Sequence, residues 1–234
     1  MRVVIAAGTS SSGKTTVLGQ VIKRLLVNGF RPAYLKVDVQ FADEPEEFAA
    51  RYKIPTRKVF SSDLCPDHCN VLVLGDAIKW ANTQGADILI VETAGLCLRC
   101  SPYIDKGLGV SVLEATSGMN LPRKIGPMLS LADVAVVTKI DLISQAEREV
   151  FRARVNEAAP VDVIEVDALR GINIDRVVRR VQTCPEITPG EKLLLRGNPP
   201  LGTCTICVGN REIGWEAHFG VVRPLEADIW YRGE

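Results

Sequence analysis

The stretch GTSSSGKTT at residues 8–16 places two glycines five residues apart and follows the second with a lysine and two threonines. This spacing matches G-x-x-x-x-G-K-[ST], the pattern of a phosphate-binding loop, and it lies between an apolar run and a helix-like segment. Backbone N–H groups of such a loop bind phosphate oxygens at the positive end of the helix dipole. In this pattern Lys14 contacts the β- and γ-phosphates and Thr15 binds Mg²⁺. The predicted nucleotide ligands in the loop are Gly8, Thr9, Ser10, Ser11, Ser12, Gly13, Lys14, Thr15 and Thr16.

Two further stretches point to guanine as the base. The sequence TKID at 138–141 is similar to the guanine-reading motif N/T-K-x-D, and DALRG at 167–171 is similar to a base-contacting loop. Both carboxylate oxygens of Asp141 can accept hydrogen bonds from N1 and N2 of guanine, and adenine lacks these paired donors. GTP is therefore the predicted substrate, with ATP as the alternative. The predicted base ligands are Thr138, Lys139, Asp141, Ala168 and Leu169.

Carboxylates that follow two apolar runs are candidates for catalysis of phosphate hydrolysis. Asp38 ends the second run, where it could hold Mg²⁺ through water or position the attacking water. The stretch VETAG at 91–95 is similar to a D-x-x-G switch, with Glu92 in place of the aspartate and Gly95 offering its N–H to the γ-phosphate. Catalysis would rest on positioning and charge stabilisation by Lys14, Asp38 and Glu92.

Six of the seven cysteines fall in three close pairs, which favours metal or redox chemistry over packing. Thiolate and imidazole ligands suit Zn²⁺ and Ni²⁺, and four thiolates also suit an iron–sulfur cluster. Nickel or zinc, an iron–sulfur cluster, a redox pair and buried packing thiols all stay open as alternatives. Cys184 stands alone and is expected to be a packing thiol. The predicted metal ligands are Cys65, His68, Cys69, Cys97, Cys100, Cys204 and Cys207.

Composition and charge argue against several other classes of protein. Lys and Arg total 28, as do Asp and Glu, and no basic stripe stands out, so a nucleic-acid partner is not expected. No apolar run approaches the roughly 18 residues of a membrane span, and the chain opens on an apolar strand rather than a secretion signal. We therefore expect a cytoplasmic protein without membrane association. In a reducing compartment the cysteines are not expected to form disulfides.

Short apolar runs alternate with amphipathic segments, and this alternation predicts a three-layer α/β fold with a mostly parallel sheet. The predicted strands are 2–7, 33–38, 88–91, 110–114, 134–138 and 161–166. The predicted helices are 14–28, 76–84, 122–130, 145–157 and 173–182. Residues 39–70 are expected to form a long connection with one helix near 44–52. After residue 185 the pattern changes to short antiparallel strands, so we predict a P-loop GTPase domain at 1–185 and a small cysteine-containing β appendage at 186–234.

The order of these motifs, together with the pattern of residues 110–143, resembles the SIMIBI class of P-loop NTPases. Within that class the chain is similar, over residues 2–182, to the nickel-inserting hydrogenase-maturation GTPase and to the urease accessory GTPase. The resemblance implies a homodimer that binds GTP, carries a metal and delivers it to a client metalloenzyme. It also implies two cysteine sites: Cys97 or Cys100 matches a cysteine just after the switch glycine, and CPDHC at 65–69 is similar to a Cys-Pro-His motif.

The sequence therefore predicts a GTP-hydrolysing metallochaperone whose metal affinity depends on the bound nucleotide. A loop that shifts when the γ-phosphate leaves changes the geometry of the thiolates attached to it, and the coupling between the two sites is reciprocal. One alternative is an NTP-driven accessory protein that carries an iron–sulfur cluster or assists the insertion of a corrinoid or cluster. Another is a small-molecule kinase, which would form a phosphorylated product without any need for thiols.

Overall fold

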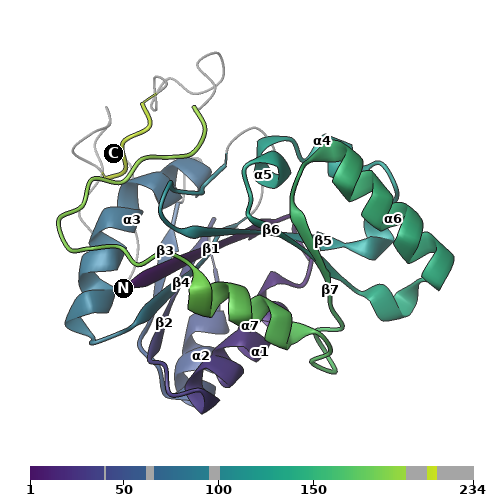
Figure 1. The fold of residues 1–234 in the computed structure, drawn as a ribbon. Coiled ribbons are helices and arrows are strands. Elements are labelled where there is room, and N and C mark those ends of the chain that lie inside the picture. Colours follow the sequence, from purple (N-terminus) through teal and green to yellow (C-terminus); the bar gives the residue numbers. More distant parts are fainter. Residues whose placement is uncertain (40, 62–65, 95–100, 199–209, 215–234) are drawn as a thin grey trace.

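The computed structural model describes residues 1–39, 41–61, 66–94, 101–198 and 210–214. Its strands form one sheet in the order β3-β2-β4-β1-β5-β6-β7, and all the pairings are parallel (Figure 1). The strands are β1 (Arg2–Gly8), β2 (Pro32–Asp38), β3 (Thr56–Phe60), β4 (Ile88–Glu92), β5 (Leu108–Glu114), β6 (Val134–Thr138) and β7 (Asp162–Glu165). The predicted α/β class with a parallel sheet is confirmed.

Helices cover both faces of the sheet and complete three layers. The helices are α1 (Lys14–Val27), α2 (Glu44–Tyr52), α3 (Pro66–Thr83), α4 (Leu121–Lys124), α5 (Pro127–Ser130), α6 (Gln145–Ala158) and α7 (Ile174–Thr183). One face of the sheet packs against α1, α2 and α7, and the other packs against α3, α5 and α6.

Strand β1 shows why the apolar runs of the sequence are continuous. Val3 and Ile5 join the buried cluster on the side of α3, whereas Val4 and Ala6 join the cluster on the side of α1 and α7. Because side chains alternate between the faces of a strand, a strand covered on both sides must be apolar at every position. The carboxyl ends of such parallel strands meet at one edge of the sheet, where ligands usually bind.

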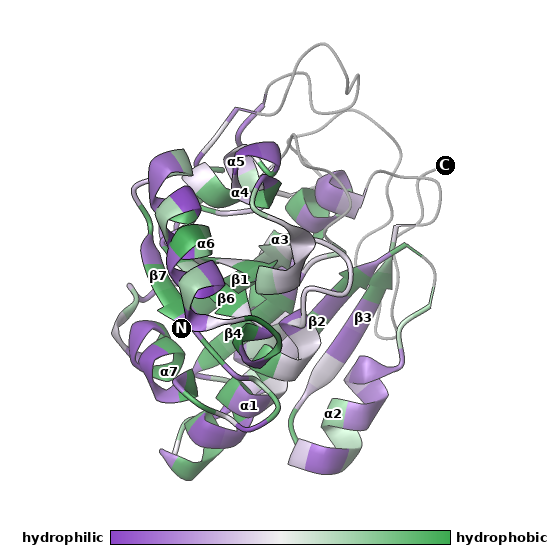
Figure 2. Ribbon diagram, turned by 90° about the vertical axis from the view of Figure 1, so that its right-hand side faces the viewer, coloured by the Kyte–Doolittle hydropathy of each residue, from purple (hydrophilic) through white to green (hydrophobic). Residues whose placement is uncertain are grey.

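The sheet contains one strand, β3, that the sequence pattern does not predict. Residues 39–70 were expected to be a connection with one helix, and the helix is present as α2, but the connection also contains β3. This strand lies at the edge of the sheet, and Val59 is its one fully buried side chain. Arg57 stacks over the Trp80 ring at 4.9 Å, and Lys58 pairs with Glu46. Charged residues are common on edge strands and hide the apolar pattern, as the hydrophilic colouring of β3 in Figure 2 illustrates.

Two helix predictions also need correction. Helix α3 begins at Pro66, whereas the sequence predicts a start near residue 76. The first half of the helix is buried on all sides, so its sequence lacks the amphipathic period from which a helix is predicted. The helix predicted at 122–130 is broken into α4 and α5. Gly126 has φ 45° and ψ −123°, and Pro127 follows it, so the backbone cannot continue as one helix there.

The described residues after α7 pack against the main domain. Ile187, Leu193 and Leu195 belong to the same buried cluster as Val3. The guanidinium of Arg196 donates to the carbonyls of Ile104 (2.8 Å), Leu131 (2.9 Å) and Gly107 (2.6 Å) and to the carboxylate of Asp133 (2.7 Å). Residues 199–209 and 215–234 lie outside the described part of the chain, so the division at residue 185 stays a prediction.

None of the helices in the described part of the chain combines the length and the apolar composition that crossing a membrane requires.

Candidate functional site

The phosphate-binding motif lies between β1 and α1, at the carboxyl edge of the sheet. Gly8 ends β1, and a Cβ atom there would meet the carbonyl oxygen of Val112 at 2.3 Å. Gly13 precedes α1 with a φ of +86°, which is a left-handed conformation that favours glycine. Both glycines of the motif are therefore required by the backbone. The positive end of the α1 dipole faces the loop, and the first turn of the helix carries no acidic residue that would neutralise it.

Lys14 lies within this loop. Its ammonium donates to the carbonyl oxygens of Gly8 at 3.1 Å and Thr9 at 3.0 Å, and the residue is 7% exposed. Burial lowers the pKa of Lys14, and the neighbouring Glu92 partly offsets this effect. The side chain is thus placed among the backbone groups that would surround a phosphate, as the motif predicts.

Glu92, at the end of β4, connects the start of α1 to the neighbouring strand β2. This carboxylate is 1% exposed and accepts three hydrogen bonds. Its Oε1 atom accepts from the hydroxyl of Thr15 at 2.8 Å and the ammonium of Lys36 at 2.6 Å, and its Oε2 atom accepts from the hydroxyl of Tyr34 at 2.8 Å. Burial, and then the charge of Glu92, raise the pKa of Tyr34, which keeps its proton for this bond.

These contacts separate the predicted roles of the two carboxylates. Because the Thr15 hydroxyl donates its hydrogen bond to Glu92, the lone pairs of the hydroxyl oxygen remain available to a cation. Glu92 itself is surrounded by donors and buried, which favours a positioning role over direct activation of water. Asp38 ends β2 at the same edge with its side chain 31% exposed, and its Oδ2 atom lies 3.7 Å from the Lys36 ammonium. Asp38 is therefore better placed than Glu92 to orient a water molecule as the nucleophile.

The two guanine motifs also meet at this edge. The hydroxyl of Thr138 donates to the carbonyl oxygen of Ser12 at 2.6 Å, which ties the TKID motif to the phosphate loop. Lys139 pairs with Glu114.

In the DALRG loop, the Arg170 guanidinium bridges Asp167 at 2.7 Å and Asp141 at 3.4 Å. Ala168 is buried and Leu169 is exposed. The carboxylate predicted to read guanine therefore lies beside the predicted base-contacting loop.

Most of the predicted metal ligands fall outside the described residues, as does Gly95. They are Cys65, Cys97, Cys100, Cys204 and Cys207. His68 and Cys69 lie in the first turns of α3 and are 2% and 0% exposed. Among the residues that the structure describes, no three His, Cys, Asp or Glu side chains come together as a metal site. The metal-ligand assignments thus stay predictions.

Cys184 is buried at the end of α7, and its thiol donates to the carbonyl oxygen of Val181 at 3.2 Å. Burial raises the pKa of this thiol to about 11. A buried neutral thiol behaves as a packing group, as the sequence analysis expected.

Three residues of the site were missed by sequence analysis: Tyr34, Lys36 and Glu44. The sequence of β2 contains one signal of this network, because Lys36 is a charged residue in a largely apolar, buried strand. Lysine is rarely fully buried without a partner, so its position indicates a buried acidic group nearby. Its partner Glu92 lies 56 residues further along the chain, beyond the reach of any local pattern.

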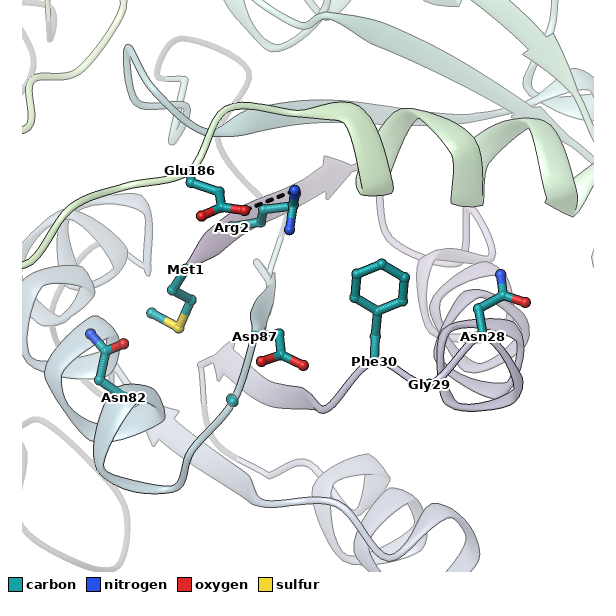
Figure 3. Close-up of a pocket in the computed structure, with 9 residues that line it drawn as sticks. Met1, Arg2, Asn28, Gly29, Phe30, Asn82, Asp87 and Glu186 are labelled. Atoms are coloured by element: carbon teal, nitrogen blue, oxygen red, sulfur yellow. Dashed lines mark ion pairs between the residues drawn. The ribbon is translucent and has the colours of Figure 1, made fainter.

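A separate cavity of about 320 Å³ opens at the amino ends of the strands (Figure 3). The ion pair of Arg2 and Glu186 lies on one side of it, and Phe30 and Asp87 also line it. Because the strands are parallel, this cavity is at the opposite edge of the sheet from residues 8–16. It contains none of the predicted nucleotide ligands.

A phosphate loop and a guanine motif at the carboxyl edge of a parallel sheet define a P-loop nucleotide-binding protein. The chain belongs to the CobW/HypB/UreG family, because residues 2–164 match the model of the CobW/HypB/UreG nucleotide-binding domain. The resemblance predicted from the motifs is confirmed by this match.

The chain is also similar in sequence to several relatives and in fold to several solved structures. An uncharacterized protein of Methanocaldococcus jannaschii is 42% identical and covers 100% of both chains. Urease accessory protein UreG 2 of Methylobacterium radiotolerans is 27% identical and covers 78% of this chain and 93% of its own. The hydrogenase maturation factor HypB of Archaeoglobus fulgidus has a TM-score of 0.63 at 21% identity, covering 78% of this chain and 89% of its own. HypB of Helicobacter pylori, solved in complex with nickel, has a TM-score of 0.61 at 15% identity, covering 80% of this chain and 91% of its own.

Proposed function

We propose that this protein is a GTP-hydrolysing metallochaperone that couples its nucleotide state to the binding and delivery of nickel. The observation that carries the proposal is the 2.8 Å hydrogen bond between Thr15 of the phosphate loop and Glu92 of β4. Cys97 follows Glu92 by five residues in the sequence, and Cys100 follows by eight. A change at the phosphate loop is thereby transmitted along one short piece of chain to a pair of thiols.

Hydrolysis in this proposal is a matter of positioning and charge. Lys14 contacts the β- and γ-phosphates, and Asp38 orients the attacking water, while Glu92 holds Thr15 in place. The oxygen donors of Thr15 and Asp38 fit Mg²⁺, which prefers hard oxygen ligands. Bound there, Mg²⁺ would neutralise negative charge on the β- and γ-phosphates. Water accepts the γ-phosphoryl group, and the products are GDP and phosphate.

Nickel is proposed as the cargo because the relatives with known names include urease accessory proteins and a HypB solved with nickel. Thiolate and imidazole donors suit Ni²⁺. Cys97 and Cys100 are the proposed ligands of the nucleotide-dependent site. Cys65, His68 and Cys69 form a second candidate set, and Cys204 and Cys207 a third. A homodimer would bring two copies of each set together, and the recipient would be a client metalloenzyme.

Replacing both Cys97 and Cys100 with serine is expected to weaken nickel binding by at least about tenfold, because two thiolates that bind the metal directly are lost. The affinity would be measured by competition with a chelator under anaerobic conditions, and the metal content by plasma mass spectrometry.

The matched control is Cys184→Ala, which removes a buried packing thiol and should leave nickel affinity unchanged. If the double variant binds nickel as tightly as the unmodified protein, these thiols are not the cargo ligands. If the anaerobic protein instead holds iron with visible charge-transfer absorbance, the cargo is an iron–sulfur cluster and the nickel assignment fails.

A further inference from the structure

Lys36 is a buried cation that no motif of the nucleotide site explains. It lies in β2, is 5% exposed, and its ammonium contacts three carboxylates. The distances are 2.6 Å to Glu92, 3.3 Å to Glu44 and 3.7 Å to Asp38. Burial lowers the pKa of Lys36, but Glu92, with help from the other two carboxylates, more than offsets it, so the pKa is raised and the side chain stays charged.

The position of this cation relates it to the phosphate loop. Lys36 and Thr15 donate to the same oxygen atom, Oε1 of Glu92. A buried ion pair by itself adds little stability over apolar packing. The Lys36–Glu92 ion pair lies at the carboxyl edge of the sheet, and Lys36 donates to the same Glu92 oxygen that orients Thr15. We therefore assign Lys36 a role in the nucleotide site rather than in the stability of the core.

The charges of the site indicate what that role is. The carboxylates of Asp38, Glu44 and Glu92 lie around two ammonium groups, those of Lys14 and Lys36, so the cluster carries one net negative charge. Without Lys36 it would carry two, in a partly desolvated group of oxygen donors. Hard oxygen donors with such a charge attract divalent cations.

We propose that Lys36 is a built-in counter-ion that positions Glu92 and keeps divalent cations from binding the site before nucleotide does. The inference rests on the proposed nucleotide site at the phosphate loop. In this arrangement the phosphates of the nucleotide supply the additional negative charge that Mg²⁺ requires, so ion and nucleotide enter together.

The test measures Mn²⁺, a paramagnetic substitute for Mg²⁺, by electron paramagnetic resonance on the full chain without nucleotide and with GDP. The unmodified protein is expected to bind Mn²⁺ tightly only with GDP. Lys36→Met should bind Mn²⁺ without nucleotide at least about tenfold more tightly than the unmodified protein, which corresponds to about 1.4 kcal/mol. Lys36→Gln keeps a donor for Glu92 without the charge and should show the same gain, so it decides the question if Lys36→Met does not fold.

The matched control is Lys58→Met, because Lys58 lies directly opposite Lys36 in the register of β2 and β3 but pairs with the exposed Glu46. It should leave Mn²⁺ binding unchanged. If the folded Lys36 variants bind Mn²⁺ without nucleotide no better than the unmodified protein, the inference is wrong and Lys36 is structural. The measurement without nucleotide is independent of the proposed function, which fails separately if the unmodified protein does not bind GDP.

Discussion

Replacing Asp141 with asparagine is expected to change the base preference of the site from guanine to xanthine nucleotides. The carboxylate can accept from both N1 and N2 of guanine, whereas an asparagine amide offers one acceptor and one donor. Asp141 lies beside the DALRG loop, where the base is predicted to bind. Because the substitution disturbs two charge-assisted hydrogen bonds to the base, GTP affinity should fall at least about a hundredfold. Xanthine carries an oxygen where guanine carries the N2 amine, and it can accept from the new amide. Calorimetric titration with GTP and XTP measures both changes.

Asp162→Asn is the matched control for this experiment. Asp162 begins β7 at the opposite edge of the sheet and is exposed, so the same change in charge should leave nucleotide affinity as it was. Unaltered GTP affinity in Asp141→Asn would refute the guanine assignment. Equal competition by ATP and GTP in the unmodified protein would refute it too.

A single methyl group at Gly8 is expected to cost about 3 kcal/mol of unfolding free energy. The added Cβ atom would lie 2.3 Å from the carbonyl oxygen of Val112, to which Gly8 is opposite in the β1–β5 register. The neighbour is backbone, so strands β1 and β5 must separate where the phosphate loop begins. GDP affinity should fall by about tenfold or more, because the loop moves with the strand. Urea unfolding and GDP titration of Gly8→Ala measure the two effects.

Gly75→Ala provides the comparison, because nothing lies within 4 Å of the Cβ position of this glycine in α3. Alanine is favoured over glycine inside a helix by roughly 0.5–1 kcal/mol, so the same substitution should stabilise the protein there. If Gly8→Ala is as stable as Gly75→Ala and binds GDP normally, the close approach of β1 to β5 is not what requires a glycine.

The parts of the fold that sequence predicted best are those whose pattern is local. Residues 2–7 and 14–28 were predicted as a strand and a helix around a motif, and β1 and α1 match them closely. Strand β3 was missed because an edge strand is half exposed, and Arg57 and Lys58 give it no apolar run. The long buried half of α3 was missed because burial on all sides leaves no helical period to detect.

The candidate site shows the same limit. The phosphate loop and the guanine motif depend on short spacings, and the structure places them at one edge of the sheet. The network around Glu92 depends on residues from two strands, β2 and β4, and two helices, α1 and α2, which only the fold brings together. A lysine inside an apolar strand was the one local hint of it, since such a lysine needs a buried partner.

Nickel titration in three nucleotide states is the most direct test of the coupling between phosphate and metal. The unmodified protein would be titrated anaerobically with Ni²⁺ in the presence of a non-hydrolysable GTP analogue, of GDP and of no nucleotide, with oligomeric mass recorded in each. We expect the nickel affinity to differ by at least about fivefold between the GTP-analogue and GDP states, and the difference to disappear when Cys97 and Cys100 are both serine. The same nickel affinity in all three states would contradict the proposed metallochaperone mechanism.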